Sequence, residues 1–181
     1  MLTRFRFALF ALIVAAVPAL AEGPGKAAIS SAHALATEAG FEVLEKGGNA
    51  FDAAVAVSAA LAVVEPSSSG IGGGGFWLLH RESDGFSTMV DGREEAPGAA
   101  TRDMYLDEHG EVDRNLATDG PLAAGIPGAA AAWVHISGTY GELGLAEVLA
   151  PAIRLAEQGF PVDVKYQQLL NWRAQVMMQW P

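Results

Sequence analysis

Cysteine is absent from the 181 residues of the chain. Its absence excludes a disulfide framework, a thiolate zinc site, a cysteine nucleophile and a lipidated cysteine at a signal-peptide junction. Histidine is scarce as well: His33, His80, His109 and His135 lie far apart, and none shows the His-Glu-x-x-His spacing of a zinc-binding helix. We therefore expect neither a metal site nor a cofactor.

Positive charge is in short supply, with 11 Lys and Arg residues against 21 Asp and Glu residues and a formal net charge of -10. Such a surface repels nucleic acid and anionic lipid, so we expect no nucleic-acid partner. The chain is 51% hydrophobic, which is enough to build one domain with a buried core.

The N-terminus has the layout of a cleavable secretory signal. Arg4 and Arg6 precede an apolar run over residues 7–17, which is followed by Pro18 and by small residues up to Ala21. The alternative, a membrane anchor, is disfavoured because the run is shorter than the roughly 18 to 20 residues that span a bilayer. We expect cleavage after Ala21, a periplasmic or secreted location, and no membrane partner once the signal is removed.

The region after the signal reads as two helices that follow a short extended segment. Residues 27–31 can be a strand or its approach, and residues 32–45 have helical spacing that ends at two glycines. Asn49 can cap the next helix with Asp52 three residues on, as in a capping box. From residue 53 to 64 nearly every residue is apolar, which predicts a helix buried on all sides.

A glycine run at residues 70–75 leads into a predicted hairpin with strands at 76–80 and 86–91 and a turn at 83–85. The run lacks the Gly-Lys-Ser/Thr ending of a phosphate-binding loop, and it precedes a strand where a dinucleotide site would open a helix. We expect its glycines to let the backbone pass close to another segment. Helices combined with a hairpin predict a layered α/β fold.

The second half of the chain is helical after an irregular stretch. Residues 92–122 are polar and irregular, with the clearest turn at 107–110. Helices are predicted at 129–140 and 145–158, and a last one begins near residue 164.

Arg93 is the leading candidate for a binding residue. It follows the second hairpin strand directly and stands among Asp91, Glu94 and Glu95. A guanidinium held at a strand end can bind a carboxylate through two parallel hydrogen bonds. An arginine among acidic residues is more often an exposed ion pair, which is the simpler interpretation from these residues alone.

Six segments, taken in order, resemble the large-subunit part of the γ-glutamyltranspeptidases. They are residues 45–56, 70–76, 91–97, 101–105, 125–128 and 152–160. The resemblance implies an N-terminal-nucleophile hydrolase with an αββα sandwich, made as a precursor that cleaves itself into a large and a small subunit. It implies transfer of the γ-glutamyl group of glutathione to water or an amino acid. The family's carboxylate-binding arginine falls on Arg93, which the resemblance makes a substrate-binding residue.

One departure from the family pattern concerns the nucleophile. The family's nucleophilic threonine opens a Thr-Thr sequence in the small subunit, whereas no two threonines are adjacent here; they are Thr3, Thr37, Thr88, Thr101, Thr118 and Thr139. We expect residues 22–181 to be the N-terminal part of the large-subunit domain, with no catalytic residue of its own and no activity alone. Its partner would be the small subunit of the same precursor.

Two alternatives stay open at this point. Relatives within the resembled family include cephalosporin (glutaryl) acylases and poly-γ-glutamate-processing enzymes, which the N-terminal part distinguishes poorly. The other alternative is a non-catalytic remnant or binding module.

Overall fold

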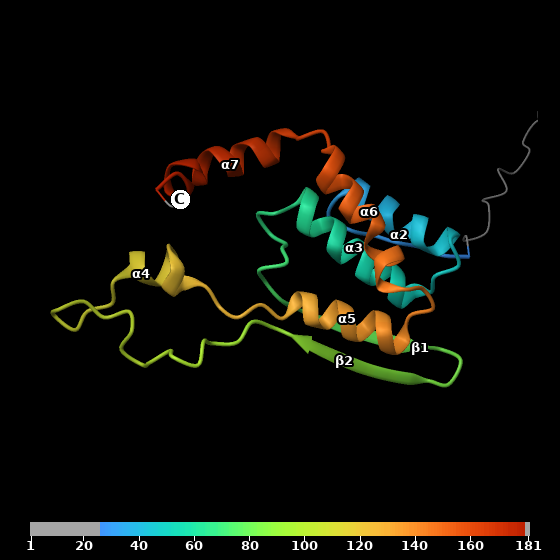
Figure 1. Cartoon of the computed structure of the whole chain (residues 1–181), viewed down its shortest axis with the longest axis horizontal. Helices are drawn as coiled ribbons and strands as arrows, with labels where there is room; N and C mark the ends of the chain where they lie inside the picture. The colour runs from blue at the N-terminus through green and yellow to red at the C-terminus, as the bar shows by residue number, and fades with distance from the viewer. Residues whose placement is uncertain (1–25, 180–181) are drawn as a thin grey trace, which may run out of the picture.

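The computed structural model describes residues 26–179, which form seven elements of regular helix, one of them a short 3-10 turn, and two strands (Figure 1). The predicted signal peptide and its cleavage site after Ala21 lie outside the described residues. In chain order the elements are α2 (Ala34–Glu45), α3 (Ala50–Val64), β1 (Gly75–Arg81), β2 (Phe86–Gly92), α4 (Arg114–Thr118), the 3-10 turn η1 (Pro121–Ala123), α5 (Ala129–Tyr140), α6 (Leu145–Gln158) and α7 (Val164–Met177).

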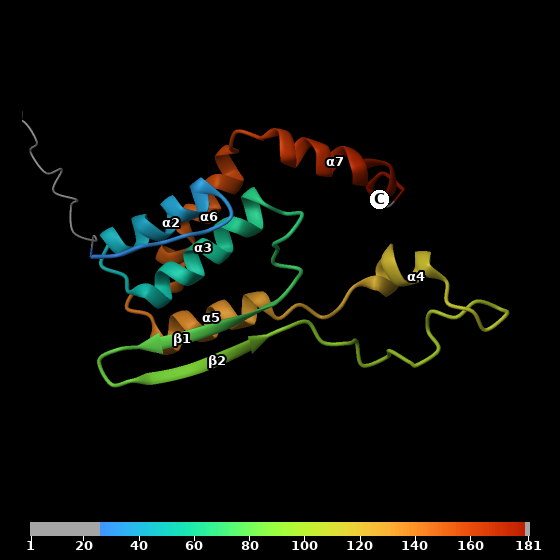
Figure 2. The ribbon, with the colours of Figure 1, turned by 180° about the vertical axis from the view of Figure 1, so that it is seen from behind.

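The elements are stacked in layers. Figures 1 and 2 show the antiparallel hairpin β1–β2 on one side, α5 across its face, and α2, α3 and α6 beyond. Helix α3 contacts α2, α5 and α6, and α5 contacts β2. The predicted layered α/β fold is therefore confirmed.

Helix α3 is the centre of the core. Every residue from 51 to 64 is buried or half-buried, as the apolar sequence predicts. Its small side chains let neighbouring helices approach closely. On α2, a β-carbon placed on Gly40 would lie only 2.7 Å from Cγ2 of Val57, so the two helices touch where that side chain is missing.

The N-terminus of α3 is fixed by the predicted capping box. The Asn49 side chain accepts hydrogen bonds from the backbone N–H groups of Phe51 (2.8 Å) and Asp52 (3.1 Å), and Asp52 Oδ2 accepts one from Asn49 N (3.0 Å). The same two side chains reach across the core. Asp52 Oδ2 also accepts from Glu142 N (2.8 Å), and Asn49 Nδ2 donates to the Tyr140 carbonyl (2.7 Å). We call this pair the Asn49–Asp52 clip.

The Asp52 carboxylate is completely buried. Its Oδ1 atom has no hydrogen-bond partner among the described residues. A β-carbon on Gly141 would overlap that oxygen, so the turn after α5 can close over the carboxylate only because residue 141 is glycine. The clip thus joins the start of α3 to the end of α5 through a buried side chain.

The hairpin turn is held by a double hydrogen bond. Arg81 donates to Asp84 from Nε (3.0 Å) and Nη2 (2.7 Å), and its guanidinium lies 5.2 Å from the centre of the Phe86 ring. Hydrogen bonding to Arg81 lowers the pKa of the Asp84 carboxyl from 3.8 to about 2. Gly85 takes a positive φ of 69°, as a tight turn requires.

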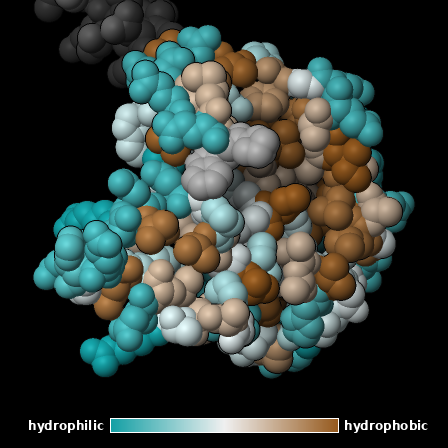
Figure 3. Space-filling model, turned by 60° about the vertical axis from the view of Figure 1, so that its left-hand side comes forward, coloured by the Kyte–Doolittle hydropathy of each residue, from teal (hydrophilic) through white to brown (hydrophobic). Residues whose placement is uncertain are grey.

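Both faces of the hairpin carry apolar side chains. Trp77, Leu79 and Val90 on one face pack into or against the helical core. On the other face Phe76, Leu78 and Met89 are 57%, 82% and 59% exposed. Exposed apolar residues occur elsewhere too, and on the face drawn in Figure 3 hydrophobic side chains gather over an area that hydrophilic ones border. A sheet that is apolar on both faces is typical of an inner layer.

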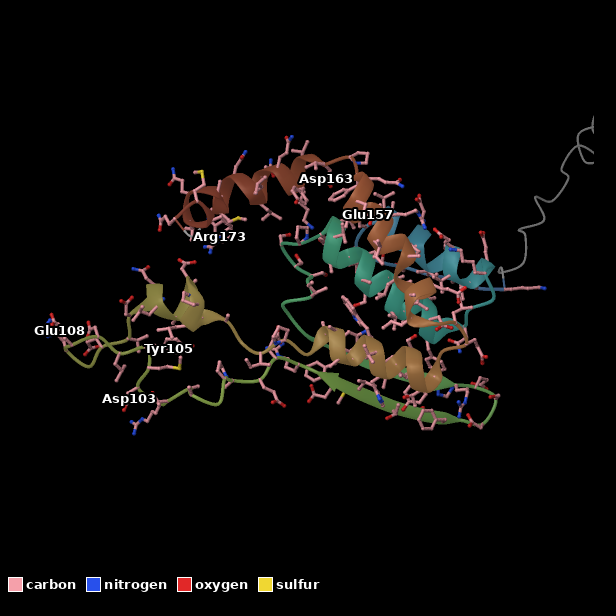
Figure 4. All side chains as sticks on the ribbon, in the orientation of Figure 1. Asp103, Tyr105, Glu108, Glu157, Asp163 and Arg173 are labelled. Atoms are coloured by element: carbon pink, nitrogen blue, oxygen red, sulfur yellow. The ribbon has the colours of Figure 1, made fainter. Side chains whose placement is uncertain are left out.

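The segment between β2 and α5 projects from the layers and meets α7 through one ion pair. In Figure 4, Asp103, Tyr105 and Glu108 lie on this projection, and Arg173 points from α7 toward α4. Arg173 Nη2 lies 2.5 Å from Asp119 Oδ1. The segment is largely irregular, as predicted.

Three details differ from the sequence-based expectations. Residues 27–31 form no strand, because no described segment pairs with their backbone. Helix α2 begins at Ala34, two residues later than expected, because His33 caps it by accepting from Leu35 N at 3.2 Å. The short α4 was not predicted; Asp113 starts it by accepting from Asn115 N at 2.8 Å.

Within residues 26–179, no helix is both long and apolar enough to cross a bilayer.

We expect Asp52→Ala to destabilise the complete protein by about 2–4 kcal/mol, because the backbone N–H groups of Asn49 and Glu142 both lose their buried acceptor. The measurement is the midpoint of urea unfolding followed by fluorescence. Asp163→Ala is the matched control: Asp163 also caps a helix, accepting from Tyr166 N at 2.7 Å, but its side chain is exposed. Equal shifts of the unfolding midpoint in the two variants would show that the buried clip adds no stability beyond that of an ordinary helix cap.

Candidate functional site

Arg93 is the first residue after β2, and its side chain is 68% exposed. Its backbone N–H donates to Asp91 Oδ1 at 3.0 Å, which closes a tight turn at the end of the strand. Its Nε lies 3.6 Å from Glu94 Oε2, and this is its one ion pair within the described residues. The expected ion pair with a neighbouring acid is therefore present but long, and it leaves most of the guanidinium open to another anion.

Three segments that are far apart in the sequence meet beside Arg93. They are the glycine run at residues 70–75, the Arg93 segment at 91–95 and the turn at 125–128. The carbonyl of Gly73 accepts from the N–H groups of Gly128 (3.2 Å) and Ala129 (3.1 Å), which ties the run to the start of α5. The backbones of residues 95 and 126 exchange two hydrogen bonds, of 2.8 and 3.1 Å.

Where the segments meet, Gly74 and Gly128 enclose the peptide that joins Gly92 to Arg93. A β-carbon on Gly74 would overlap the Gly92 carbonyl oxygen and lie 2.9 Å from Arg93 Cα. A β-carbon on Gly128 would overlap the same oxygen and lie 2.7 Å from the Arg93 carbonyl oxygen. We call Gly74, Gly92 and Gly128 the glycine crossing. None of the three has a positive φ, so glycine is needed there for space.

The glycine run is not uniformly crowded. A β-carbon on Gly72 would meet no atom within 4 Å, and one on Gly70 would meet only a backbone nitrogen at 3.9 Å. The prediction that the run permits close backbone approach is confirmed at Gly74, where the Arg93 segment passes.

A groove of about 550 Å³ runs between β2 and α5, with Arg93 and Glu95 among the residues that line it. The β2 side of the groove is formed by residues 88–92, and the α5 side includes Ala131, His135 and Tyr140. His135 and Tyr140 could not be predicted as groove residues from the sequence. Their helix was predicted, but which of its faces meets β2 depends on packing that the local pattern does not contain.

The chemistry that the site supports is recognition of an anion. A guanidinium at the end of a strand is fixed at its base, and its planar donors match the two oxygens of a carboxylate. Asp91 and Glu95 line the same groove and make it unfavourable for a ligand with negative charge alone. No group of three or more His, Cys, Asp or Glu side chains within residues 26–179 is arranged to hold a metal ion.

Comparison with known proteins gives a consistent result. The family model described as "Gamma-glutamyltranspeptidase" matches residues 36–181. The "Glutathione hydrolase proenzyme" of Bacillus subtilis (strain 168) is 44% identical over 137 residues, which is 75% of this chain. The "Acylase ACY 1 proenzyme" of Pseudomonas sp. (strain V22) is 46% identical over 137 residues, 72% of this chain.

A solved structure agrees with the sequence matches. The crystal structure of Helicobacter pylori gamma-glutamyltranspeptidase superposes with a TM-score of 0.81 and 42% identity, covering 87% of this chain and 46% of that one. The matched part spans 23% of the length of the Bacillus subtilis relative and 24% of the Pseudomonas acylase.

Proposed function

Because the chain belongs to the γ-glutamyltranspeptidase family, we propose that it is the N-terminal part of the large subunit of a proenzyme that acts on γ-glutamyl compounds such as glutathione. The complete enzyme would transfer the γ-glutamyl group to water or to an amino acid. The observation that carries the proposal is Arg93, which presents an open guanidinium at the end of β2 in a chain that the family model matches from residue 36 to 181.

In this proposal the chain supplies substrate binding, and the nucleophile comes from outside it. Arg93 binds the α-carboxylate of the γ-glutamyl group through paired hydrogen bonds. A threonine at the N-terminus of the small subunit attacks the γ-carbonyl, with its own free amine taking the hydroxyl proton. The bond from the γ-carbonyl carbon to the amide nitrogen then breaks, and the amine leaves with that proton. The resulting ester passes its acyl group to water or to an amino acid. Residues 22–181 alone would bind weakly and catalyse nothing.

In this proposal Arg93 contributes by holding the substrate in position. The α-carboxylate lies at the end of the glutamyl group away from the reacting carbonyl, so anchoring it fixes the distance and direction of that carbonyl. Holding a substrate in a reactive position accounts for a large part of enzymatic rate enhancement. A strand end is a rigid base for an anchor, whereas a loop position would allow the guanidinium to move.

A glutaryl acylase is the second candidate, and the similarity to the Pseudomonas acylase favours it. A glutaryl group also carries a carboxylate at the end away from its amide, so Arg93 would suit it equally. The two groups differ at the α-carbon, where the γ-glutamyl group has an ammonium and the glutaryl group has none. Discrimination between them therefore depends on residues that recognise the ammonium.

The proposal includes export. Residues 1–21 would direct the precursor across the membrane and be removed after Ala21, which leaves the enzyme in the periplasm or outside the cell.

We expect the exported protein to begin at Glu22. N-terminal sequencing of the large subunit from the periplasm or medium measures this directly. Replacing Ala21 by a bulky residue should block cleavage there, because signal peptidase requires a small residue at that position. A mature protein that retains residues 1–21 would contradict the proposed processing.

A substrate panel on the complete, matured enzyme tests the proposed activity. We expect faster cleavage of a γ-glutamyl anilide than of the matching glutaryl anilide at equal concentration, with release of the same aniline as the readout. Faster cleavage of the glutaryl compound would assign the protein to the acylases.

In the complete enzyme, Arg93→Lys should raise KM for a γ-glutamyl substrate by about tenfold or more, because lysine keeps the charge but loses the second parallel hydrogen bond. The value of kcat should change less. Arg102→Lys is the matched control, since the Arg102 side chain is 96% exposed and lies near the acidic side chain of Asp103. An unchanged KM in Arg93→Lys would remove Arg93 from the binding site.

A further inference from the structure

We infer that Gly74 and Gly128 are positioning residues for Arg93, and that they set where its guanidinium meets the substrate carboxylate. This inference rests on the proposed function, in which Arg93 binds that carboxylate. It distinguishes these two glycines from Gly72, because a β-carbon on either of them would press on the Arg93 backbone, whereas one on Gly72 would meet no atom within 4 Å.

The contacts of the two glycines are with the backbone of Arg93 itself. A β-carbon on Gly74 would press on Arg93 Cα and on the backbone nitrogen of Glu94. One on Gly128 would press on the Arg93 carbonyl oxygen. Either β-carbon would also overlap the carbonyl oxygen of Gly92. The backbone of Arg93 is therefore confined from two directions by chain segments that approach without side chains.

Confinement of the backbone limits where the guanidinium can go. The Arg93 N–H is bonded to Asp91, and the carbonyl of Gly73 holds the start of α5 in place beside it. With its backbone fixed, Arg93 has only its side-chain torsions left to adjust. A displacement of about 1 Å in a positioning group can lower the reaction rate a hundredfold. A small shift of the Arg93 backbone at the crossing should therefore weaken its contact with the substrate carboxylate.

A new methyl group at residue 74 or 128 has no free space to enter. Since its nearest neighbours are backbone atoms, no flexible side chain can swing aside, and the segment carrying Arg93 has to move. A methyl group added at Gly72 would meet no atom within 4 Å, although Gly72 lies in the same run, only two residues before Gly74. Gly72→Ala is therefore a matched control for Gly74→Ala.

The experiment compares two substrates in the complete, matured enzyme. One is a γ-glutamyl anilide, and the other is the matching γ-aminobutyryl anilide, which lacks the α-carboxylate. The ratio of their kcat/KM values measures how much the enzyme gains from the carboxylate. A general loss of structure lowers both kcat/KM values and leaves the ratio unchanged, whereas misplacement of Arg93 lowers the ratio.

We expect Gly74→Ala to lower this ratio by about tenfold, mainly through a higher KM for the γ-glutamyl compound. Gly72→Ala should keep the wild-type ratio. The effects of Gly74→Ala and Arg93→Lys should be less than additive in the double variant, because both act on one interaction. A wild-type ratio in Gly74→Ala, or full additivity with Arg93→Lys, overturns the inference.

Arg93→Lys measured alongside distinguishes this inference from the proposed function. If Arg93→Lys itself leaves the ratio unchanged, Arg93 does not bind the carboxylate and the proposed role fails. If Arg93→Lys lowers the ratio and Gly74→Ala does not, only the positioning role of the glycines fails.

Gly125→Ala keeps the test decisive if Gly74→Ala does not mature. A β-carbon on Gly125 would lie 3.0 Å from Glu94 Cβ and 3.4 Å from the Glu95 carbonyl oxygen, so it presses on the same segment less severely. We expect a smaller loss of the ratio, by a few-fold, with maturation retained. Equal losses for both substrates in Gly125→Ala would overturn the inference.

Discussion

The constraint on which the site depends is the lack of space around the peptide between Gly92 and Arg93. Two other segments cross this peptide so closely that neither can carry a β-carbon at the point of contact. The crossing joins the hairpin to the start of α5, since Gly73 in one segment accepts from the first N–H groups of that helix. The crossing fixes the position of β2 against α5 and therefore the groove between them. It also fixes the backbone from which the Arg93 side chain extends.

Helix α3 and the hairpin show how the rest of the chain is arranged around that junction. The small side chains of α3 let three helices pack on it, which places α5 between the helical layer and the hairpin (Figure 1). The hairpin offers a second apolar face, formed by Phe76, Leu78 and Met89, on the side away from the helices. The chain spans less than a quarter of the Bacillus subtilis relative, and a two-sided apolar sheet is suited to an inner layer of a larger protein.

Features that depend on neighbouring residues could be predicted from the sequence, and features that depend on distant ones could not. The cap made by Asn49 and Asp52 was predictable because its parts lie within three residues, but the bond from Asp52 to Glu142 N joins positions 90 residues apart. Residues 27–31 lack a strand partner, which no local propensity reveals. The place of Arg93 at a strand end followed from local pattern and its proposed role from family resemblance. The glycine crossing required three segments to be brought together by the fold.

The Asn49–Asp52 clip also sets an order of events during synthesis. Glu142 is made 90 residues after Asp52, which at ordinary elongation rates is an interval of roughly 5 to 18 s. For most of that interval, from the completion of α3 at Val64 to the start of α5 at Ala129, α3 is complete in sequence while α5 and α6, which pack on it, have not been made. The most apolar of the described helices therefore emerges well before the helices that cover it, and its apolar surface stays exposed during that part of synthesis.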